Sequence, residues 1–299
     1  MNPTPAVIET QYLVAPFGLG LFDAALGRFV SEGLVVRLLR RIGGDLAPPI
    51  TARATRRDLF TAQDLPGLRG FEAGGLLSPP MPWLVEVRDI WSRYTPFVIE
   101  ALLPHAGLLL QAPCTAALWP QPLTSPASPL PQGVPLLGHP ARPVAAGQAL
   151  VRATLRDADS GAPAAWAVLE VALDGRLLGR GVADARGEVA ASFPWPEPAD
   201  PLPVFSPGSP PGPPAPAHPL DQARWPVQIA VRWQRGLPLH HTDPAQPDLP
   251  ELCALLTQPL AALSVATSPP EPLHEALLRY GQTLVLAADA GARMLVHPA

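Results

Sequence analysis

The 299-residue chain contains no lysine, and charged residues make up only 15% of it, compared with about 25% in a typical soluble protein. All 21 basic side chains are arginines, whose planar guanidinium groups suit protein interfaces. The net charge is -4, and the arginines form no basic stripe that could follow a phosphate backbone, so nucleic acid is excluded as a partner. So few charges predict that other protein subunits cover part of the surface.

Cysteine and long apolar runs are also scarce. Cys114 and Cys253 are the only cysteines, and neither has a second cysteine at the spacing of a zinc or redox site, so we expect two buried free thiols. No run of 18 apolar residues occurs, and the first residues lack a basic segment followed by an apolar stretch. We therefore expect no membrane insertion and a cytoplasmic protein, which could assemble there into a particle that is later released.

Proline is abundant, with 43 residues. The stretches 113–143 and 194–219 are proline-rich and longer than the loops of a compact domain, which is typical of functional connections or disorder. We expect the first stretch to be a linker. The second is expected to be an insertion that docks on a partner.

The remaining sequence has the pattern of short β-strands separated by turns. Residues 19–39 predict a strand, a turn and a strand, and residues 83–104 predict a hairpin. The expected fold is therefore mainly β, with two tandem antiparallel β-sandwich modules joined by the proline-rich linker. The modules span residues 1–112 and 144–240, and the insertion lies within the second.

The last residues, 241–299, predict a small α/β segment that packs on the second module. Leucines at helical spacing indicate a helix over 248–258 with Asp248 as its cap. A second helix is expected over 270–281, ending at Gly281. Residues 283–299 then predict a closing hairpin.

Four features of the first module recur in the same order in the second. Asp23 and Gly27 enclose three residues after an apolar strand, as do Asp157 and Gly161. The first module contains the segments LVVRLL, TARATRRDLF and WLVEVR. They correspond, in the same order, to VLEVAL, GVADARGEVAASF and WPVQIAVRW of the second module. This order predicts an internal duplication.

No catalytic, cofactor-binding or metal-binding motif is complete. His274 and Glu275 resemble the start of a zinc-protease motif, but Leu278 stands where the second histidine belongs. A dinucleotide fingerprint beginning at Gly18 fails because Asp23 replaces its third glycine. No Gly-x-Ser-x-Gly elbow and no phosphate-binding Gly-Lys-Ser/Thr loop occur. The sequence predicts a protein that is not an enzyme and that needs no cofactor or metal.

Two kinds of polar cluster leave alternatives open. His240, His241 and Asp243 could hold a metal, but adjacent histidines on a strand point to opposite faces, so an exposed polar turn is favoured. The pairs Asp157/Asp159 and Asp184/Glu188 could act as acid and base or bind calcium. Each pair lies beside a glycine at a turn, which favours hydrogen bonds to the turn backbone.

The seven tryptophans suggest two different binding roles. Exposed indoles could stack on sugar rings, or they could be buried in a core or an interface. We favour burial and take four aromatic residues as candidate interface anchors: Trp119, Trp195, Phe205 and Trp225.

The stretch from Val151 to Phe193 resembles the carboxypeptidase regulatory-like, or transthyretin-like, β-sandwich. The residues that match this pattern are Asp157, Gly161, Pro163, Ala167, Ala183, Asp184 and Gly187. The first module matches more loosely, because Arg57 and Asp58 replace the second Asp-x-x-Gly turn. The resemblance implies a non-catalytic seven-stranded sandwich appended to larger assemblies.

The tandem architecture with proline-rich arms is also similar to accessory structural proteins of phage-tail-like contractile injection particles. We therefore expect a structural subunit, such as a cap, collar or baseplate accessory, whose partners are other protein subunits. The alternative is a carbohydrate or cell-surface binding module. A third possibility is an enzyme whose site has no recognisable motif.

Overall fold

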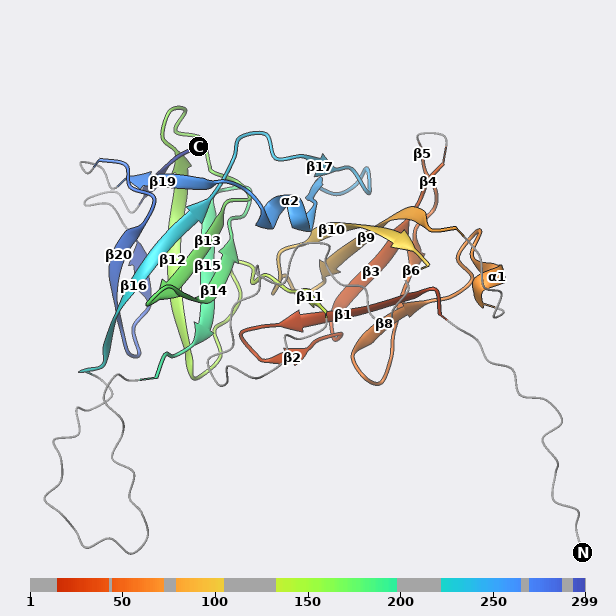
Figure 1. The fold of residues 1–299 in the computed structure, drawn as a ribbon, viewed down its shortest axis with the longest axis horizontal. Helices are drawn as coiled ribbons and strands as arrows, with labels where there is room; N and C mark the ends of the chain where they lie inside the picture. The colour runs from red at the N-terminus through yellow and green to blue at the C-terminus, as the bar shows by residue number, and fades with distance from the viewer. Residues whose placement is uncertain are drawn as a thin grey trace, which may run out of the picture.

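The computed structural model of the chain describes residues 15–42, 45–72, 79–104, 133–197, 222–264, 269–286 and 293–298. Within these ranges the protein is mainly β, with two short helices, which confirms the predicted class. The molecule is elongated, and each half of the chain forms one end of it (Figure 1). The described residues of 15–143 are termed the N-terminal half, and those of 144–298 the C-terminal half.

The N-terminal half contains two main sheets. The first consists of β1 (Phe17–Asp23), β2 (Arg28–Phe29), β7 (Arg53–Ala54), β8 (Leu59–Ala62) and β11 (Val134–Pro135). The second consists of β3 (Leu34–Leu39), β6 (Ile50–Thr51), β9 (Met81–Asp89) and β10 (Phe97–Leu103), in the order β10-β9-β3-β6. β9 and β10 form the expected antiparallel hairpin. The remaining elements are β4 (Arg41–Ile42), β5 (Asp45–Leu46) and α1 (Arg69–Glu72).

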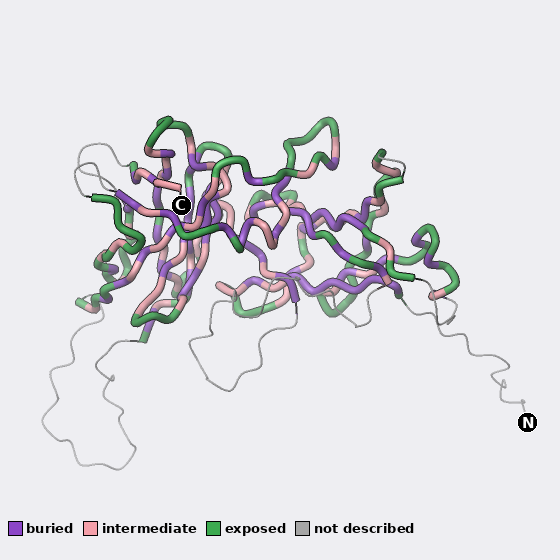
Figure 2. Tube along the Cα trace, turned by 45° about the horizontal axis from the view of Figure 1, so that its top comes forward, coloured by how far each residue is buried: buried purple, intermediate pink, exposed green. Residues whose placement is uncertain are grey.

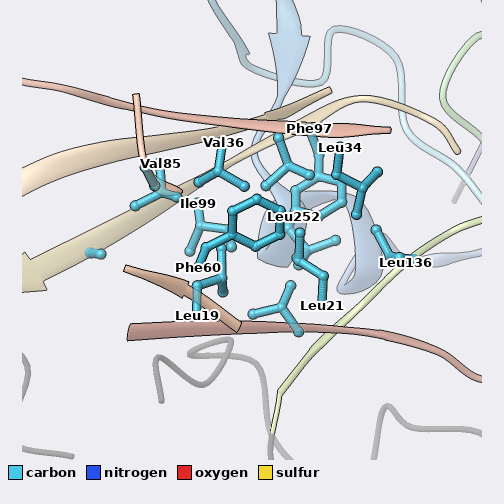
Figure 3. Packing of buried hydrophobic residues seen from close by; sticks show 14 of the residues in the cluster. Leu19, Leu21, Leu34, Val36, Phe60, Val85, Phe97, Ile99, Leu136 and Leu252 are labelled. Carbon is cyan, nitrogen blue, oxygen red and sulfur yellow. The ribbon is translucent and has the colours of Figure 1, made fainter. Parts of the chain in front are cut away.

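The core of the N-terminal half lies between these two sheets (Figure 3). Leu19 on β1 and Phe60 on β8 pack toward Val36 on β3 and Ile99 on β10. Alternate residues of a strand point to opposite faces, so the alternating apolar positions of these strands form one shared interior. Leu136, in the described part of the expected linker, belongs to the same core.

The C-terminal half contains a nine-stranded sheet. Its strands are β12 (Gln148–Asp157), β13 (Val168–Leu173), β14 (Arg176–Val182), β15 (Glu188–Pro194), β16 (Arg224–Arg232), β19 (Leu260–Ser264), β20 (His274–Arg279), β21 (Leu284–Leu286) and β22 (Met294–His297). The order is β14-β13-β16-β19-β22-β12-β15, with β20 on β16 and β21 on β12. A separate core cluster lies inside this half. Buried stretches follow the strands of both halves, and exposed residues gather at the turns (Figure 2).

The sheet of the C-terminal half curls until its two end strands meet. A Cβ atom on Gly181 of β14 would lie 2.2 Å from the carbonyl oxygen of Ala190 on β15. A Cβ atom on Gly179 would lie 2.8 Å from the ring of Phe193. The close approach of β14 to β15 therefore requires glycine at position 181, where the neighbour is backbone.

Residues 237–256, termed the crossover segment, run from the C-terminal half onto the N-terminal half. They contain β17 (Leu239–His240), β18 (Leu249–Pro250) and α2 (Leu252–Leu256). Leu252, Leu255 and Leu256 of α2 belong to the core of the N-terminal half, where Figure 3 places Leu252 beside Phe97. The crossover segment therefore interlocks the two halves, whereas we expected it to pack on the second module.

The helix predicted over 248–258 is much shorter than expected. Glu251, not Asp248, caps α2, and its carboxylate accepts a hydrogen bond from the backbone N–H of Ala254 at 2.6 Å. Asp248 instead contacts His241. Residues 249 and 250 form β18, which delays the start of the helix.

Two other predictions for the last residues are wrong. Residues 274–279 form strand β20, which pairs antiparallel with β16, not a helix. No closing hairpin forms among the described residues of 283–298, because β21 and β22 each pair in parallel with β12. Residues 287–292 lie outside the described ranges.

The turns that follow β1 and β12 have the same hydrogen bonds. The Gly27 N–H donates to the Asp23 carbonyl at 2.8 Å, and the Gly161 N–H donates to the Asp157 carbonyl at the same distance. Each aspartate side chain also accepts from the N–H two residues later. Both glycines have positive φ, which only glycine adopts without strain.

The turns before β8 and β15 correspond as well, although their sequences differ. The Thr55 N–H donates to the Leu59 carbonyl at 2.7 Å, and the Asp184 N–H donates to the Glu188 carbonyl at 2.9 Å. Asp58 has φ +57° where Gly187, in the other half, has φ +78°. The pairing registers of β1 with β8 and of β12 with β15 are related by constant offsets that also align Asp23 with Asp157.

An arginine from a distant part of the chain binds each turn aspartate. Arg142 donates to the buried Asp23 at 2.5 Å, and Arg235 donates to the buried Asp157 at 2.6 and 2.9 Å. The hydrogen bonds from Arg235 are the main reason why the pKa of Asp157 falls from 3.8 to about 2.

Replacing Asp157 with asparagine should destabilise the protein at pH 7 by about 2 kcal/mol, because the charge-assisted hydrogen bonds from Arg235 are lost. A carboxyl whose folded pKa is depressed stabilises the fold above its unfolded pKa, and this contribution is lost as the pH falls. The difference between wild type and Asp157→Asn should therefore shrink from about pH 4 and vanish near pH 2. Urea unfolding at several pH values measures it, and Asp159→Asn, at an exposed carboxylate that also contacts Arg235, is the control with little effect. A pH-independent difference would contradict the assignment.

Candidate functional site: an aromatic platform and a groove

The turn between β9 and β10 presents an exposed apolar surface. Ile90 is 65% exposed and Trp91 is 51% exposed. The guanidinium of Arg93 lies over the Trp91 ring, 4.4 Å from its centroid. We term Ile90, Trp91 and Arg93 the Trp91 platform. Tryptophan and arginine are the residues most enriched among the strong contacts of protein interfaces.

Hydrogen bonds to Asp89 and packing against Gly33 hold the Trp91 platform in place. The buried side chain of Asp89 accepts hydrogen bonds from the backbone N–H, Nε and Nη2 of Arg93 at 2.6, 3.0 and 3.1 Å. A Cβ atom on Gly33 would lie 2.5 Å from the Trp91 ring, so the indole rests against glycine backbone. A preordered anchor loses little side-chain entropy when a partner binds.

A groove of about 710 Å³ runs along β10, the edge strand of the second sheet of the N-terminal half. The crossover segment forms its other wall. We term this the β10 groove. Its lining residues are Arg41, Pro82, Trp83, Leu84, Glu100, Ala101, Leu102, Pro238, His240, Glu251, Cys253 and Ala254.

The groove is apolar with a few polar groups around it. Leu102 is 60% exposed. Val98, on the same strand, is fully buried against the crossover segment. The indole N–H of Trp83 is buried and has no hydrogen-bond partner among the residues that the structure describes. The Nε2 atom of His240 lies 3.8 Å from a Glu100 carboxylate oxygen.

An ionic network fixes the crossover segment beside the groove. Glu86 is fully buried and accepts hydrogen bonds from Arg37 at 2.7 and 3.0 Å, and it also contacts Arg88. Arg37 reaches Asp243 of the crossover segment at 3.3 Å. Its hydrogen bond to Glu86 is the main reason why the pKa of Arg37 is raised. The charges of this network are already paired, so it fits a structural role.

Cys253 lines the β10 groove, and it is disulfide-bonded, so the prediction of a free thiol is wrong. The other cysteine of the chain, Cys114, lies outside the described residues. A disulfide is typical of proteins in oxidising surroundings.

The structure places two of the four candidate anchors. Trp225 is only 4% exposed, and its indole N–H donates to the Glu197 carbonyl at 3.1 Å, so it belongs to the core and not to a free surface. Trp195 is half-buried and packs on the rings of Trp225 and Tyr280, with centroids 5.7 and 4.9 Å apart. Trp119 and Phe205 lie outside the described residues.

Sequence reasoning missed Trp91, although one signal was available. The expected hairpin of residues 83–104 places its turn between Arg88 and Arg93. A tryptophan at the turn of a hairpin is more exposed than one within a strand. The apolar residues on both sides of this turn predict the two strands but not the exposure of Trp91.

The three polar residues of the histidine cluster do not converge on one point in the described part of the chain. His240 lies near Glu100, His241 bonds to Asp248 at 2.8 Å, and Asp243 bonds to Arg37. The three side chains thus have three different partners. No group of three or more potential metal ligands occurs in the described ranges.

The first aspartate of each carboxylate pair binds the backbone of its own turn. The Asp184 carboxylate accepts from the N–H groups of Arg186 and Glu188 at 2.8 and 3.0 Å. Asp157 and Asp159 both contact Arg235. These contacts agree with the turn interpretation of both pairs.

Comparisons with known proteins give no family for this chain. No protein-family model, no curated protein and no solved structure matches it. Of the helices in the described ranges, none is long and apolar enough to cross a lipid bilayer.

Proposed function

We propose that the chain is a non-catalytic structural subunit that binds other protein subunits in a larger assembly. The observation that carries this proposal is the Trp91 platform, an exposed aromatic and arginine anchor held by a buried aspartate. A fixed anchor of this kind is suited to a protein interface, where a few such residues supply most of the affinity. The interlocked halves suit a subunit that holds its neighbours in position.

We further propose that each half is one transthyretin-like sandwich and that the two arose by duplication. The matching hydrogen bonds of the turns at Asp23 and Asp157 support this, as do the matching turns at Thr55 and Asp184. We also propose that the assembly is a phage-tail-like contractile injection particle. This proposal rests on the similarity of the tandem architecture and proline-rich arms to accessory proteins of such particles. In this proposal the chain assembles in the cytoplasm, and its disulfide forms after the particle is released.

Native sedimentation from the source cells tests the proposed function. Wild type should migrate with other subunits, and Trp91→Ala should lose this co-migration, because a central anchor contributes about 2 kcal/mol or more, or roughly 30-fold in affinity. Leu273→Ala, at a residue that is 45% exposed in the C-terminal half, is the matched control and should retain it. Wild type that migrates alone at its mass of 31.6 kDa would overturn the proposal.

The carbohydrate-binding alternative rests on the same exposed indole, which could stack on a sugar ring. Isothermal titration of the isolated chain against a glycan panel separates the two functions. Saturable micromolar binding that Trp91→Ala abolishes would favour the carbohydrate module. The structural subunit is expected to show no heat of binding.

A further inference from the structure

The strands β16 and β20 present an outward face in the C-terminal half. Even-numbered residues of β20 point inward, with Leu278 fully buried, and odd-numbered residues point outward. Leu277 is 43% exposed and lies opposite the exposed Pro226 of β16. The Tyr280 N–H donates to the Ala223 carbonyl at 3.1 Å, which makes Leu277 and Pro226 a non-hydrogen-bonded pair, whose side chains lie close together. These two residues form a small exposed apolar patch.

The charges around this patch are not balanced within the described part of the chain. Glu275 and Arg279 of β20 are exposed, and neither forms an ion pair with any residue that the structure describes. Four residues of a strand span about 13 Å, and Leu277 stands between the two side chains. Arg279 also lies directly opposite the exposed Arg224 of β16. Like charges at directly opposite positions destabilise a sheet, so this face lacks an acid beside its two arginines.

A second copy of the chain, related by a two-fold axis, supplies the missing charges. When the axis passes beside Leu277 and lies across the strand, the two β20 strands face each other in antiparallel directions, and each leucine packs on its equivalent. Glu275 then faces Arg279 of the partner subunit, and the reverse contact is identical. Each acid therefore lies beside the two neighbouring arginines of the other copy. The sequence Glu-x-Leu-x-Arg of β20 is complementary to itself about its own centre.

We propose that this surface binds a second copy of the chain in a two-fold dimer. We term it the β20 face, and its residues are Arg224, Pro226, Glu275, Leu277 and Arg279. The apolar patch forms the centre of the contact, and two Glu275–Arg279 ion pairs flank it. A two-fold contact is complete with two copies, and the Trp91 platform lies in the other half of each chain. The dimer therefore goes beyond the proposed function and does not depend on it.

Sedimentation velocity of the purified full chain at increasing concentration tests the proposal. Wild type should form a dimer, at twice the monomer mass of 31.6 kDa, at tens of micromolar chain. Glu275→Arg and Arg279→Glu each place like charges in both ion pairs, so each should weaken the dimer at least about 10-fold. Arg53→Glu makes the same kind of change at an exposed residue of β7 and should have no effect. Wild type that remains a monomer at about 100 μM would overturn the proposal.

A mixture of the two charge variants tests the two-fold geometry itself. Glu275→Arg and Arg279→Glu should each be mainly monomeric alone. Mixed in equal amounts, they should form a dimer that contains one copy of each, because both pairs then again join opposite charges. Native mass spectrometry identifies this dimer when one variant carries a mass label. Its formation also shows that both variants are folded, whereas a mixture that stays monomeric contradicts the proposed pairing.

The Trp91→Ala variant separates this inference from the proposed function. It should form the dimer as readily as wild type, because Trp91 lies on the turn between β9 and β10 and takes no part in the β20 face. Loss of the dimer in Trp91→Ala, with the dimer retained in Glu275→Arg, would assign self-association to the Trp91 platform and sink the idea. Failure of the β20 face would leave the co-migration test at Trp91 unaffected.

Discussion

Replacing Gly181 with alanine is expected to destabilise the protein by at least about 3 kcal/mol, and to leave little soluble chain if the total stability is ordinary. The added Cβ atom would lie 2.2 Å from the Ala190 carbonyl oxygen and 2.6 Å from its carbon. Ala190 cannot retreat freely, because its strand β15 is paired with β12 at Arg152. Relief of this clash therefore requires β14 and β15 to move apart.

Two further glycine-to-alanine variants should have smaller effects on the free energy of unfolding. At Gly179 the nearest atoms belong to the Phe193 side chain, which can turn, so Gly179→Ala should cost less, about 1–2 kcal/mol. Gly70→Ala meets no atom within 4 Å and lies in α1, so it should be neutral or slightly stabilising. Urea unfolding of all three variants checks the order. A Gly181→Ala variant as stable as Gly70→Ala would show that β14 and β15 do not approach closely.

The strands were predictable where one face of the sheet is buried. In β12 every second residue is buried, from Ala149 to Asp157, and this alternation was visible as an apolar pattern in the sequence. The hairpin of β9 and β10 was predictable for the same reason. Local pattern suffices here because a strand with one buried face needs no information about its partner.

The turn before β8 was harder to recognise because its residues differ from those of its counterpart. Thr55 accepts hydrogen bonds through a hydroxyl where Asp184 uses a carboxylate. Asp58 adopts the positive φ that Gly187 adopts in the other half. Aspartate tolerates this conformation better than most residues, so the turn persists although the Asp-x-x-Gly pattern is lost.

The strand β20 was not predictable from its own residues. His274, Ala276 and Leu278 face inward and Leu277 faces outward, but the leucine spacing also fits a helix. Pairing with β16 over six residues decides between the two, and this partner is distant in the sequence. Short apolar segments have no fixed preference, so tertiary contacts override propensity.

The disulfide at Cys253 and the exposure of Trp91 depend on the same long-range information. Sequence spacing reveals a cysteine pair only when the framework repeats a known pattern, and Cys114 and Cys253 are far apart. Trp91 is exposed because the turn between β9 and β10 lies outside the core. Both features follow from where the chain folds back on itself.

Replacing Leu252 with alanine should cost about 3 kcal/mol, the typical loss for a fully buried leucine. Leu252 belongs to α2 in the crossover segment, yet it fills the core between the two sheets of the N-terminal half (Figure 3). The interlock predicts that both halves are affected. Hydrogen exchange should therefore accelerate in β10 and also in β19, the next strand after α2.

Leu239→Ala is the matched control, because Leu239 lies in the same crossover segment but is 43% exposed. It should change the free energy of unfolding by less than about 0.5 kcal/mol. Circular dichroism and tryptophan fluorescence should give coincident unfolding curves for wild type, as expected when the halves unfold together. If Leu252→Ala loosens only β10 while β19 keeps its protection, the two halves are joined by a tether and are not interlocked. The rigid spacing that a structural subunit requires would then have to come from its neighbours.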